Sequence, residues 1–156
     1  MSSSKKNKKD GSTKKTSIKK TSAKVTYLPE DPQNQKLYGE LAIENAELER
    51  FENRTTVRRY TIDFSCPEFT CLCPRSGFPD FATIKISYIP DRYCVELKSL
   101  KMYINSFRNK KVFHEDVTNG IIQDMIDLLD PHEITVIGDF TVRGNIHTVV
   151  TAKHKK

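Results

Sequence analysis

Residues 60–90, YTIDFSCPEFTCLCPRSGFPDFATIKISYIP, decide the fold of this chain. Apolar side chains recur at every second position near each end of the stretch, which predicts two half-buried strands paired antiparallel. These positions are Tyr60, Ile62 and Phe64 in the first strand and Ile84, Ile86 and Tyr88 in the second. Between them, residues 65–80 hold three cysteines and three prolines. We expect a long irregular link here, and such links inside compact domains are usually functional.

Two amphipathic helices are predicted after this pair, within residues 93–111 and 114–130. Each segment carries apolar side chains three to four residues apart, and Pro131 ends the second. The stripes consist of Leu97, Leu100, Ile104 and Phe107, and of Val117, Ile121, Met125 and Leu128. Glu115 and Asp116 are expected in the first turn of the second helix, where the helix dipole favours acidic side chains.

The chain finishes with two more alternating runs, residues 134–140 and 145–151, around a predicted turn at residues 143–145. The order is therefore strand, strand, helix, helix, strand, strand. This pattern predicts an α+β fold with two helices packed on one face of a four-stranded antiparallel sheet.

Charge is distributed unevenly along the 156 residues. Residues 1–24 hold nine lysines and one aspartate, so their net charge is +8 and the rest of the chain carries −2. We predict that residues 1–24 form a disordered tail, a solubilising appendage that could contact RNA transiently. Residues 25–53 are expected to be a lead-in with a short helix or ordered segment within 33–53, and residues 54–156 a single domain.

The chain shows neither the apolar run of a signal peptide nor a membrane span of the usual ~20 apolar residues, so a cytoplasmic location is expected. Its four cysteines should then be reduced, and buried, catalytic or metal-binding. Cys73, which precedes Pro74 in the link and has Asp80 seven residues on, is the best candidate for a nucleophile. Judged alone it would more often be a buried structural thiol, the role left to the other three.

Cys66, Cys71, Cys73 and His114 are the residue types that could together bind zinc. The spacing C-x4-C-x-C lacks the paired C-x2-C knuckle of convincing zinc sites, so we expect no metal.

Three motifs in the predicted core, at residues 69–90, 95–109 and 113–116, resemble the NADPH-dependent 7-cyano-7-deazaguanine reductases of queuosine biosynthesis. The resemblance implies the tunnelling fold of that family and a four-electron reduction of a nitrile to an amine with two NADPH. It also implies that Cys73 forms a covalent thioimide with the nitrile carbon and that Asp80 donates a proton.

The segment ELKSLKMY, residues 96–103, matches the cofactor motif of that family. The resemblance implies NADPH contacts from Glu96, Leu97, Lys98, Ser99 and Lys101, with Glu96 and Leu97 also near the substrate. Without it, this segment would be a solvated helix face.

The pair His114 and Glu115 matches the family's substrate-binding residues. A carboxylate can accept hydrogen bonds from the N–H and amino edge of a guanine-like base, and His114 could orient the adduct or relay a proton. Without the resemblance, Glu115 would simply serve the helix dipole. The chain departs from the family at Phe78, where many members have Gln, and at Ser76, where many have Thr, so the details of substrate contact are open.

A core of this size has little room to enclose both a deazaguanine and a dinucleotide, so sites between subunits are expected. The resemblance implies closed rings, a pentamer or a decamer of two stacked rings. From the lack of apolar spans and the charge outside the tail, we expect no membrane contact and no direct nucleic-acid requirement. Two alternatives remain: an amidinotransferase of the same fold that adds ammonia to the nitrile, and a non-enzymatic RNA-associated module. The intact motif at 96–103 argues against the first, and the charge of −2 outside the tail argues against the second.

Overall fold

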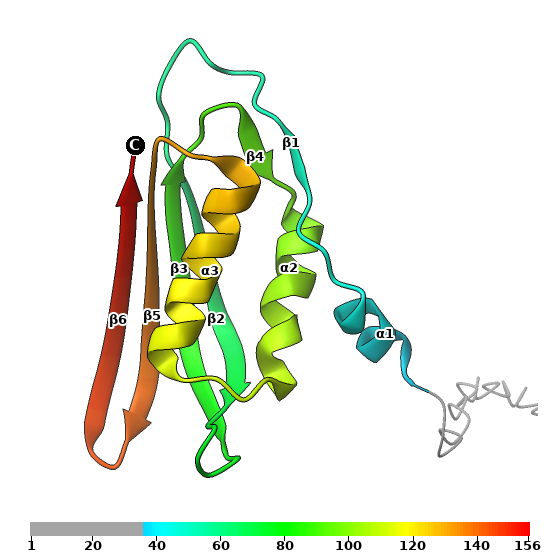
Figure 1. Cartoon of the computed structure of the whole chain (residues 1–156), viewed down its shortest axis with the longest axis vertical. Helices are drawn as coiled ribbons and strands as arrows, with labels where there is room; N and C mark the ends of the chain where they lie inside the picture. Colours follow the sequence, from blue (N-terminus) through cyan, green and yellow to red (C-terminus); the bar gives the residue numbers. More distant parts are fainter. Residues whose placement is uncertain (1–35) are drawn as a thin grey trace, which may run out of the picture. The chain divides into compact units, whose positions relative to one another are not determined.

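A four-stranded antiparallel sheet with two helices on one face forms the body of the protein (Figure 1). The computed structural model describes residues 36–156, so the predicted tail at 1–24 lies outside the described residues. The sheet has the order β2-β3-β5-β6, with strands β2 (Ile62–Leu72), β3 (Pro79–Ile89), β5 (Glu133–Arg143) and β6 (Ile146–Lys155). Helices α2 (Leu97–Asn105) and α3 (His114–Leu129) cover it, with a 3-10 helix η1 (Ser106–Asn109) after α2. The predicted α+β class and element order are confirmed.

Three smaller elements accompany the sheet. Helix α1 (Tyr38–Glu44) lies in the segment where the sequence predicts a short helix. Strands β1 (Arg50–Glu52) and β4 (Tyr93–Val95) pair antiparallel as a separate ribbon, which the sequence pattern does not predict. The ribbon ties the lead-in to the start of α2, because the Glu96 N–H donates to the Glu49 carbonyl at 2.8 Å.

The prediction of a long irregular link between the first two strands is wrong. Strand β2 continues to Leu72, so only residues 73–78 separate it from β3. The register shifts between Cys66 and Phe69, which accommodates Pro67. A proline without an N–H is tolerated there because β2 is an edge strand with a bulge. Beyond the bulge the two-residue period resumes, with Phe69 and Cys71 buried.

The core lies between the sheet and the two helices. The inward side of β3 is buried as predicted, with Ile84, Ile86 and Tyr88 almost fully covered. Most of the predicted helical stripes are also buried, but Leu97 is 64% exposed and Leu128 only partly buried. Leu97 opens the first turn of α2 and so does not face the sheet, which corrects its place in the predicted apolar stripe.

Close contact between α3 and β5 depends on Gly138. A Cβ atom at this position would lie 2.5 Å from Thr118 Oγ1 and 2.7 Å from Phe140 Cε2, closer than real Cβ contacts come. Thr118 is fully buried, and its hydroxyl donates to the His114 carbonyl at 2.9 Å. Because Gly138 has no side chain, the start of α3 can pack closely against the sheet.

The last hairpin turns at Gly144 and Asn145, with φ of 54° and 67°. Two successive left-handed residues match a type I′ turn, which confirms the predicted turn at 143–145. No helix within residues 36–156 has the length and apolar character needed to cross a bilayer.

Candidate active site

The turn between β2 and β3 presents Cys73. Its N–H donates to the Phe78 carbonyl and its carbonyl accepts from the Gly77 N–H, each at 2.8 Å. Gly77 has φ of 74°, a conformation that glycine adopts without strain. The thiol is partly exposed, and hydrogen bonds from the Ser76 hydroxyl and then from the backbone N–H groups of Ser76 and Arg75 lower its pKa. The turn therefore favours the thiolate, the nucleophilic form of cysteine.

The other three cysteines lie in different surroundings. Burial raises the pKa of Cys71 to about 11, with the Asp80 charge adding to the shift, and burial also raises the pKa of Cys66. Cys94 is buried, and all four thiols are free. Only Cys73 combines exposure with a lowered pKa, which supports its prediction as the nucleophile.

Asp80 lies near the start of β3, paired in register with Cys71. Its carboxylate is 10% exposed and has two basic neighbours: Arg143 Nη2 lies 2.8 Å from Oδ1, and His114 Nε2 lies 3.4 Å from Oδ2. The Asp80 charge also acts on the Cys73 thiol. The structure thus brings Asp80, His114 and Cys73 to the same end of the sheet.

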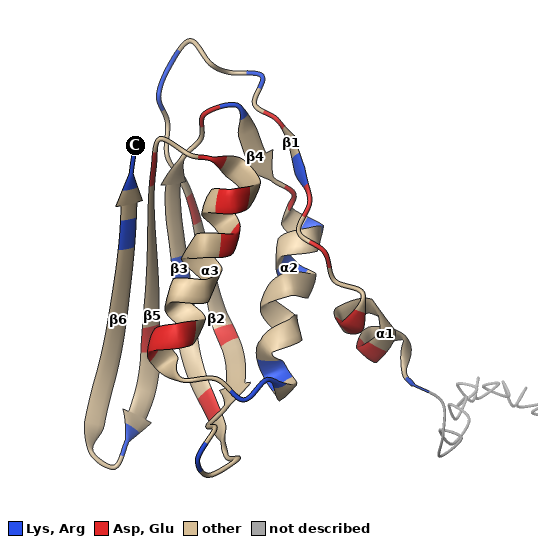
Figure 2. Cartoon of the chain, viewed as in Figure 1, with Lys and Arg blue, Asp and Glu red and all other residues tan. Residues whose placement is uncertain are grey.

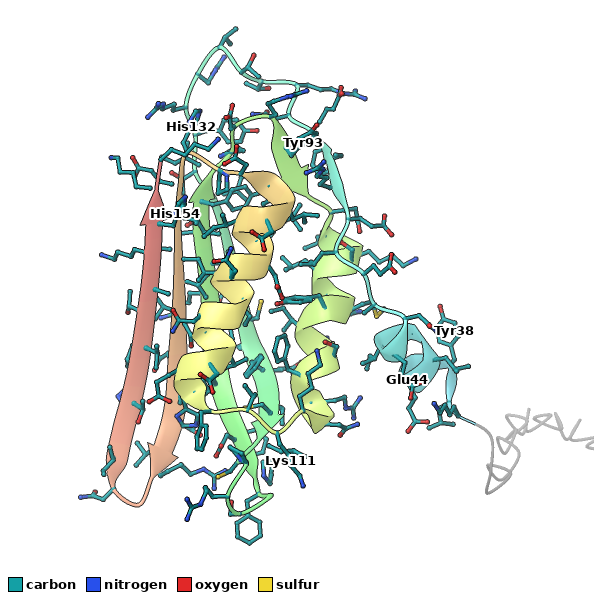
Figure 3. All side chains as sticks on the ribbon, in the orientation of Figure 1. Tyr38, Glu44, Tyr93, Lys111, His132 and His154 are labelled. Carbon is teal, nitrogen blue, oxygen red and sulfur yellow. The ribbon has the colours of Figure 1, made fainter. Side chains whose placement is uncertain are left out.

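The segment before α3 is tied to the end of β2, next to Cys73. The Leu72 N–H donates to the Lys110 carbonyl at 3.0 Å, and the Leu72 carbonyl accepts from the Val112 N–H at 3.1 Å. Lys111, labelled in Figure 3, lies at this junction. Because α3 begins three residues later, this bridge fixes where His114 starts the helix.

His114 is held on a flat aromatic surface. Its ring stacks on Phe140, with centroids 3.7 Å apart and an interplanar angle of 8°. Glu115 follows it in the first turn of α3, is exposed, and makes no side-chain hydrogen bond or ion pair with the described residues. Its carboxylate is therefore free to accept hydrogen bonds from a ligand.

Two of the predicted cofactor residues, Glu96 and Ser99, stabilise the first turn of α2. Glu96 is the N-cap, and its carboxylate accepts from the N–H groups of Lys98 at 2.9 Å and Ser99 at 2.7 Å, which lowers its pKa. The buried Ser99 hydroxyl donates to the Glu96 carbonyl and accepts from the Glu49 N–H. Lys98, Lys101 and Leu97 are exposed and can reach a ligand.

The structure does not bring the start of α2 to Cys73. Asp80 lies at one end of β3 and Ile89 at the other, after which β4 leads into α2. At ~3.4 Å per residue, an eleven-residue strand spans about 35 Å. Figure 1 shows the same arrangement, with the β2–β3 turn and the first turn of α2 near opposite ends of the sheet.

Sequence reasoning misses Arg143 and Phe140, which it assigns only to a turn and to a strand. Neither has a motif of its own, since both become site residues because β5 pairs with β3 and carries them beside Asp80 and His114. Among residues 36–156, no group of three or more His, Cys, Asp and Glu side chains is arranged to hold a metal ion.

The overall architecture has a solved counterpart. The crystal structure of the archaeosine synthase QueF-Like in the apo form matches with a TM-score of 0.56 and 17% identity, covering 60% of this chain and 91% of that one. The likeness confirms the predicted tunnelling fold. Fold and site together define a tunnelling-fold protein in which a partly exposed thiol with a lowered pKa lies at the same end of the sheet as an aspartate and a histidine.

Comparison with known sequences narrows this class. The family model described as QueF-like protein matches residues 79–156. The NADPH-dependent 7-cyano-7-deazaguanine reductase of Aquifex aeolicus is 58% identical over 119 residues, 76% of this chain and 92% of the relative. That of Trichormus variabilis is 52% identical over 125 residues, 80% of this chain and 92% of the relative. The chain belongs to the family of NADPH-dependent 7-cyano-7-deazaguanine reductases.

Proposed function

We propose that this chain reduces the nitrile of 7-cyano-7-deazaguanine to the aminomethyl group of 7-aminomethyl-7-deazaguanine with two NADPH, a step of queuosine biosynthesis. The names of its relatives support the substrate and the cofactor. The observation that carries the proposal is the thiol of Cys73, which has a lowered pKa and lies at the same end of the sheet as Asp80 and His114.

Cys73 begins the reaction as the nucleophile. Its Sγ adds to the nitrile carbon while the nitrile nitrogen takes a proton, which gives a covalent thioimide. In its protonated form Asp80 is the proton donor and is left as a carboxylate, and His114 is placed to return a proton to it because Nε2 lies 3.4 Å from Oδ2. The addition converts a linear nitrile into a trigonal carbon that can accept hydride.

Reduction of a nitrile to a primary amine takes four electrons, so two hydrides are needed in turn. NADPH supplies these when bound. The exposed ammonium groups of Lys98 and Lys101 suit its phosphates, and the exposed Leu97 offers an apolar contact. Glu96 and Ser99 keep this surface in place by capping α2, which refines the role that the sequence suggests for them.

Substrate recognition is assigned to the first turn of α3. Glu115 carries an exposed carboxylate that can accept two hydrogen bonds from the donor edge of a guanine-like base. His114 next to it is fixed by its stack on Phe140. The two residues then orient the base so that its nitrile meets Cys73.

A complete site needs a second subunit. The first turn of α2 lies at the opposite end of the sheet from Cys73, and β2 and β6 have free edges in the described chain. Large apolar side chains are exposed near the Cys73 end, at Phe78, Phe81, Phe113, Val142 and Ile146. Surfaces of this kind mark interfaces, so we place the site between subunits of a pentameric or decameric ring.

One titration tests the chemistry. The protein is mixed with 7-cyano-7-deazaguanine, and a new near-ultraviolet band from the thioimide is expected, followed by loss of NADPH absorbance when NADPH is added. Cys73→Ala should remove the band, whereas Cys66→Ala should retain it. A band that survives in Cys73→Ala would show that another group is the nucleophile, and a band without NADPH consumption would exclude the reductase.

A further inference from the structure

A groove of about 600 Å³ lies between the edge strand β2 and the helical segment α2–η1. Apolar side chains of both elements line it, among them Phe64 and Phe69 from β2 and Leu100 and Ile104 from α2. Its volume falls in the range of ~300–1,000 Å³ that is usual for small-molecule sites. The groove is separate from the turn that carries Cys73.

Two cations line the same groove. Lys101 and Arg108 are seven residues apart, close to two helical turns, so they lie on one side of α2–η1. Figure 2 shows basic residues on this segment. Neither side chain has a carboxylate within 4.0 Å among residues 36–156, whereas Glu68 is the one acidic residue that lines the groove. Two cations without partners beside an apolar wall suit a ligand with phosphates and a flat ring.

We propose that this groove binds the adenosine half of NADPH, with Arg108 on the 2′-phosphate and Lys101 on the pyrophosphate; this inference rests on the proposed function. A guanidinium group matches a phosphate monoester with two parallel hydrogen bonds, and arginine commonly accommodates the 2′-phosphate of this cofactor. Lys101 belongs to the motif already assigned to NADPH, so the groove continues that surface. Arg108 would thus select NADPH over NADH.

The geometry also gives the cofactor a direction. The Arg108 end of the groove lies near the chain's own Cys73, because Leu72 bonds to Lys110 just beyond η1. The Leu97 end lies at the far side, where α2 begins. With the 2′-phosphate at Arg108, the nicotinamide lies toward Leu97 and serves the Cys73 of a neighbouring subunit.

Binding measurements test this without turnover. The full chain is titrated with NADPH by its fluorescence, and bound NADPH is displaced with adenosine 2′,5′-bisphosphate or with 5′-AMP, which lacks the 2′-phosphate. In Arg108→Ala, the Kd of NADPH and of the bisphosphate should rise about tenfold or more, while that of 5′-AMP stays within about twofold. Lys101→Ala should weaken binding of NADPH and NADH by similar factors, because both contain the pyrophosphate.

Arg54→Ala removes the same charge from an exposed loop outside the groove and should leave all these constants unchanged. Arg108→Lys should recover part of the preference. Equal losses for the bisphosphate and 5′-AMP in Arg108→Ala, or no loss at all, would overturn the assignment. Formation of the thioimide band needs no NADPH, so wild-type protein that lacks the band would instead count against the proposed function.

Discussion

The Arg143 guanidinium lies 2.8 Å from Oδ1 of Asp80, while His114 approaches the other oxygen, Oδ2, of the same carboxylate. Arg143 closes strand β5 and comes to Asp80 only because β5 pairs with β3. The two contacts fix the orientation of the Asp80 side chain, which is proposed to deliver the proton when it is protonated. We therefore expect Arg143 to act on the reaction through Asp80, as a positioning residue.

Replacing Arg143 by Ala should slow thioimide formation about tenfold or more, since small misplacements of a catalytic group are costly. The free energy of unfolding should fall by ~1–3 kcal/mol, because the nearly buried Asp80 carboxylate loses its closest cation. Stopped-flow measurement of the thioimide band and thermal unfolding check both parts. Arg143→Lys should recover part of the rate, and a wild-type rate in Arg143→Ala would contradict the positioning role.

The pH dependence of alkylation should report the lowered pKa of the Cys73 thiol. A pKa below the ordinary value of 9.0 means that more thiolate is present at any pH below that value, so the site reacts there faster than a free thiol. Ser76→Ala removes the hydroxyl that contributes most to the shift, and the midpoint of the rate–pH curve should then move to higher pH.

Iodoacetamide labelling followed by peptide mass spectrometry makes this measurement at Cys73. Ser76→Thr keeps the hydroxyl and should retain the low midpoint. Cys71, whose pKa is raised to about 11, serves as an internal reference and should stay unmodified in the folded protein. An unchanged midpoint in Ser76→Ala would show that the backbone N–H groups alone lower the pKa.

Tyr103 belongs to the cofactor motif but faces the protein interior. It is 8% exposed, and its hydroxyl donates to the Asp124 carboxylate on α3; burial and this bond raise the pKa of the phenol. Tyr103→Phe should destabilise the fold by ~1–3 kcal/mol, because Asp124 loses its partner. The Kd of NADPH should stay within about twofold. A large loss of NADPH affinity with unchanged stability would place Tyr103 in the cofactor site instead.

The sequence predicts the sheet and its helices well because period-two and helical patterns report local burial. It fails between residues 65 and 80, where the bulge at Pro67 interrupts the alternation and hides the extent of β2. The same bulge shapes the edge strand beside the groove. The stretch that breaks the two-residue period is therefore part of the bulged strand β2. The turn that carries Cys73 is much shorter than the predicted link.

Site residues divide along similar lines. Cys73, Asp80 and His114 could be proposed from motifs, and the structure places them together. Arg143 and Phe140 could not, because their contacts arise from strand pairing across long sequence separations. Glu96 caps α2 through hydrogen bonds that many acidic residues make at the start of a helix. Part of the motif assigned to the cofactor therefore stabilises the helix.

Gly138 offers the sharpest test of how the fold positions the site. In Gly138→Ala the new Cβ would press on Thr118 and Phe140, the residues that hold the first turn of α3 and the His114 ring. Overpacking of this kind should cost ~1–3 kcal/mol of unfolding free energy and also reduce activity, because His114 is displaced. Thermal unfolding and the rate of thioimide formation measure the two effects on one sample.

Gly120→Ala is the matched control. Gly120 lies within α3, and a Cβ atom added to it would have no neighbour within 4 Å, so alanine should stabilise the helix by ~0.5–1 kcal/mol through its higher helix propensity. Activity should remain at the wild-type level, because the packing of α3 against β5 is unchanged. If Gly138→Ala unfolds at the wild-type temperature with wild-type activity, then the close approach of α3 to β5 does not govern where His114 lies.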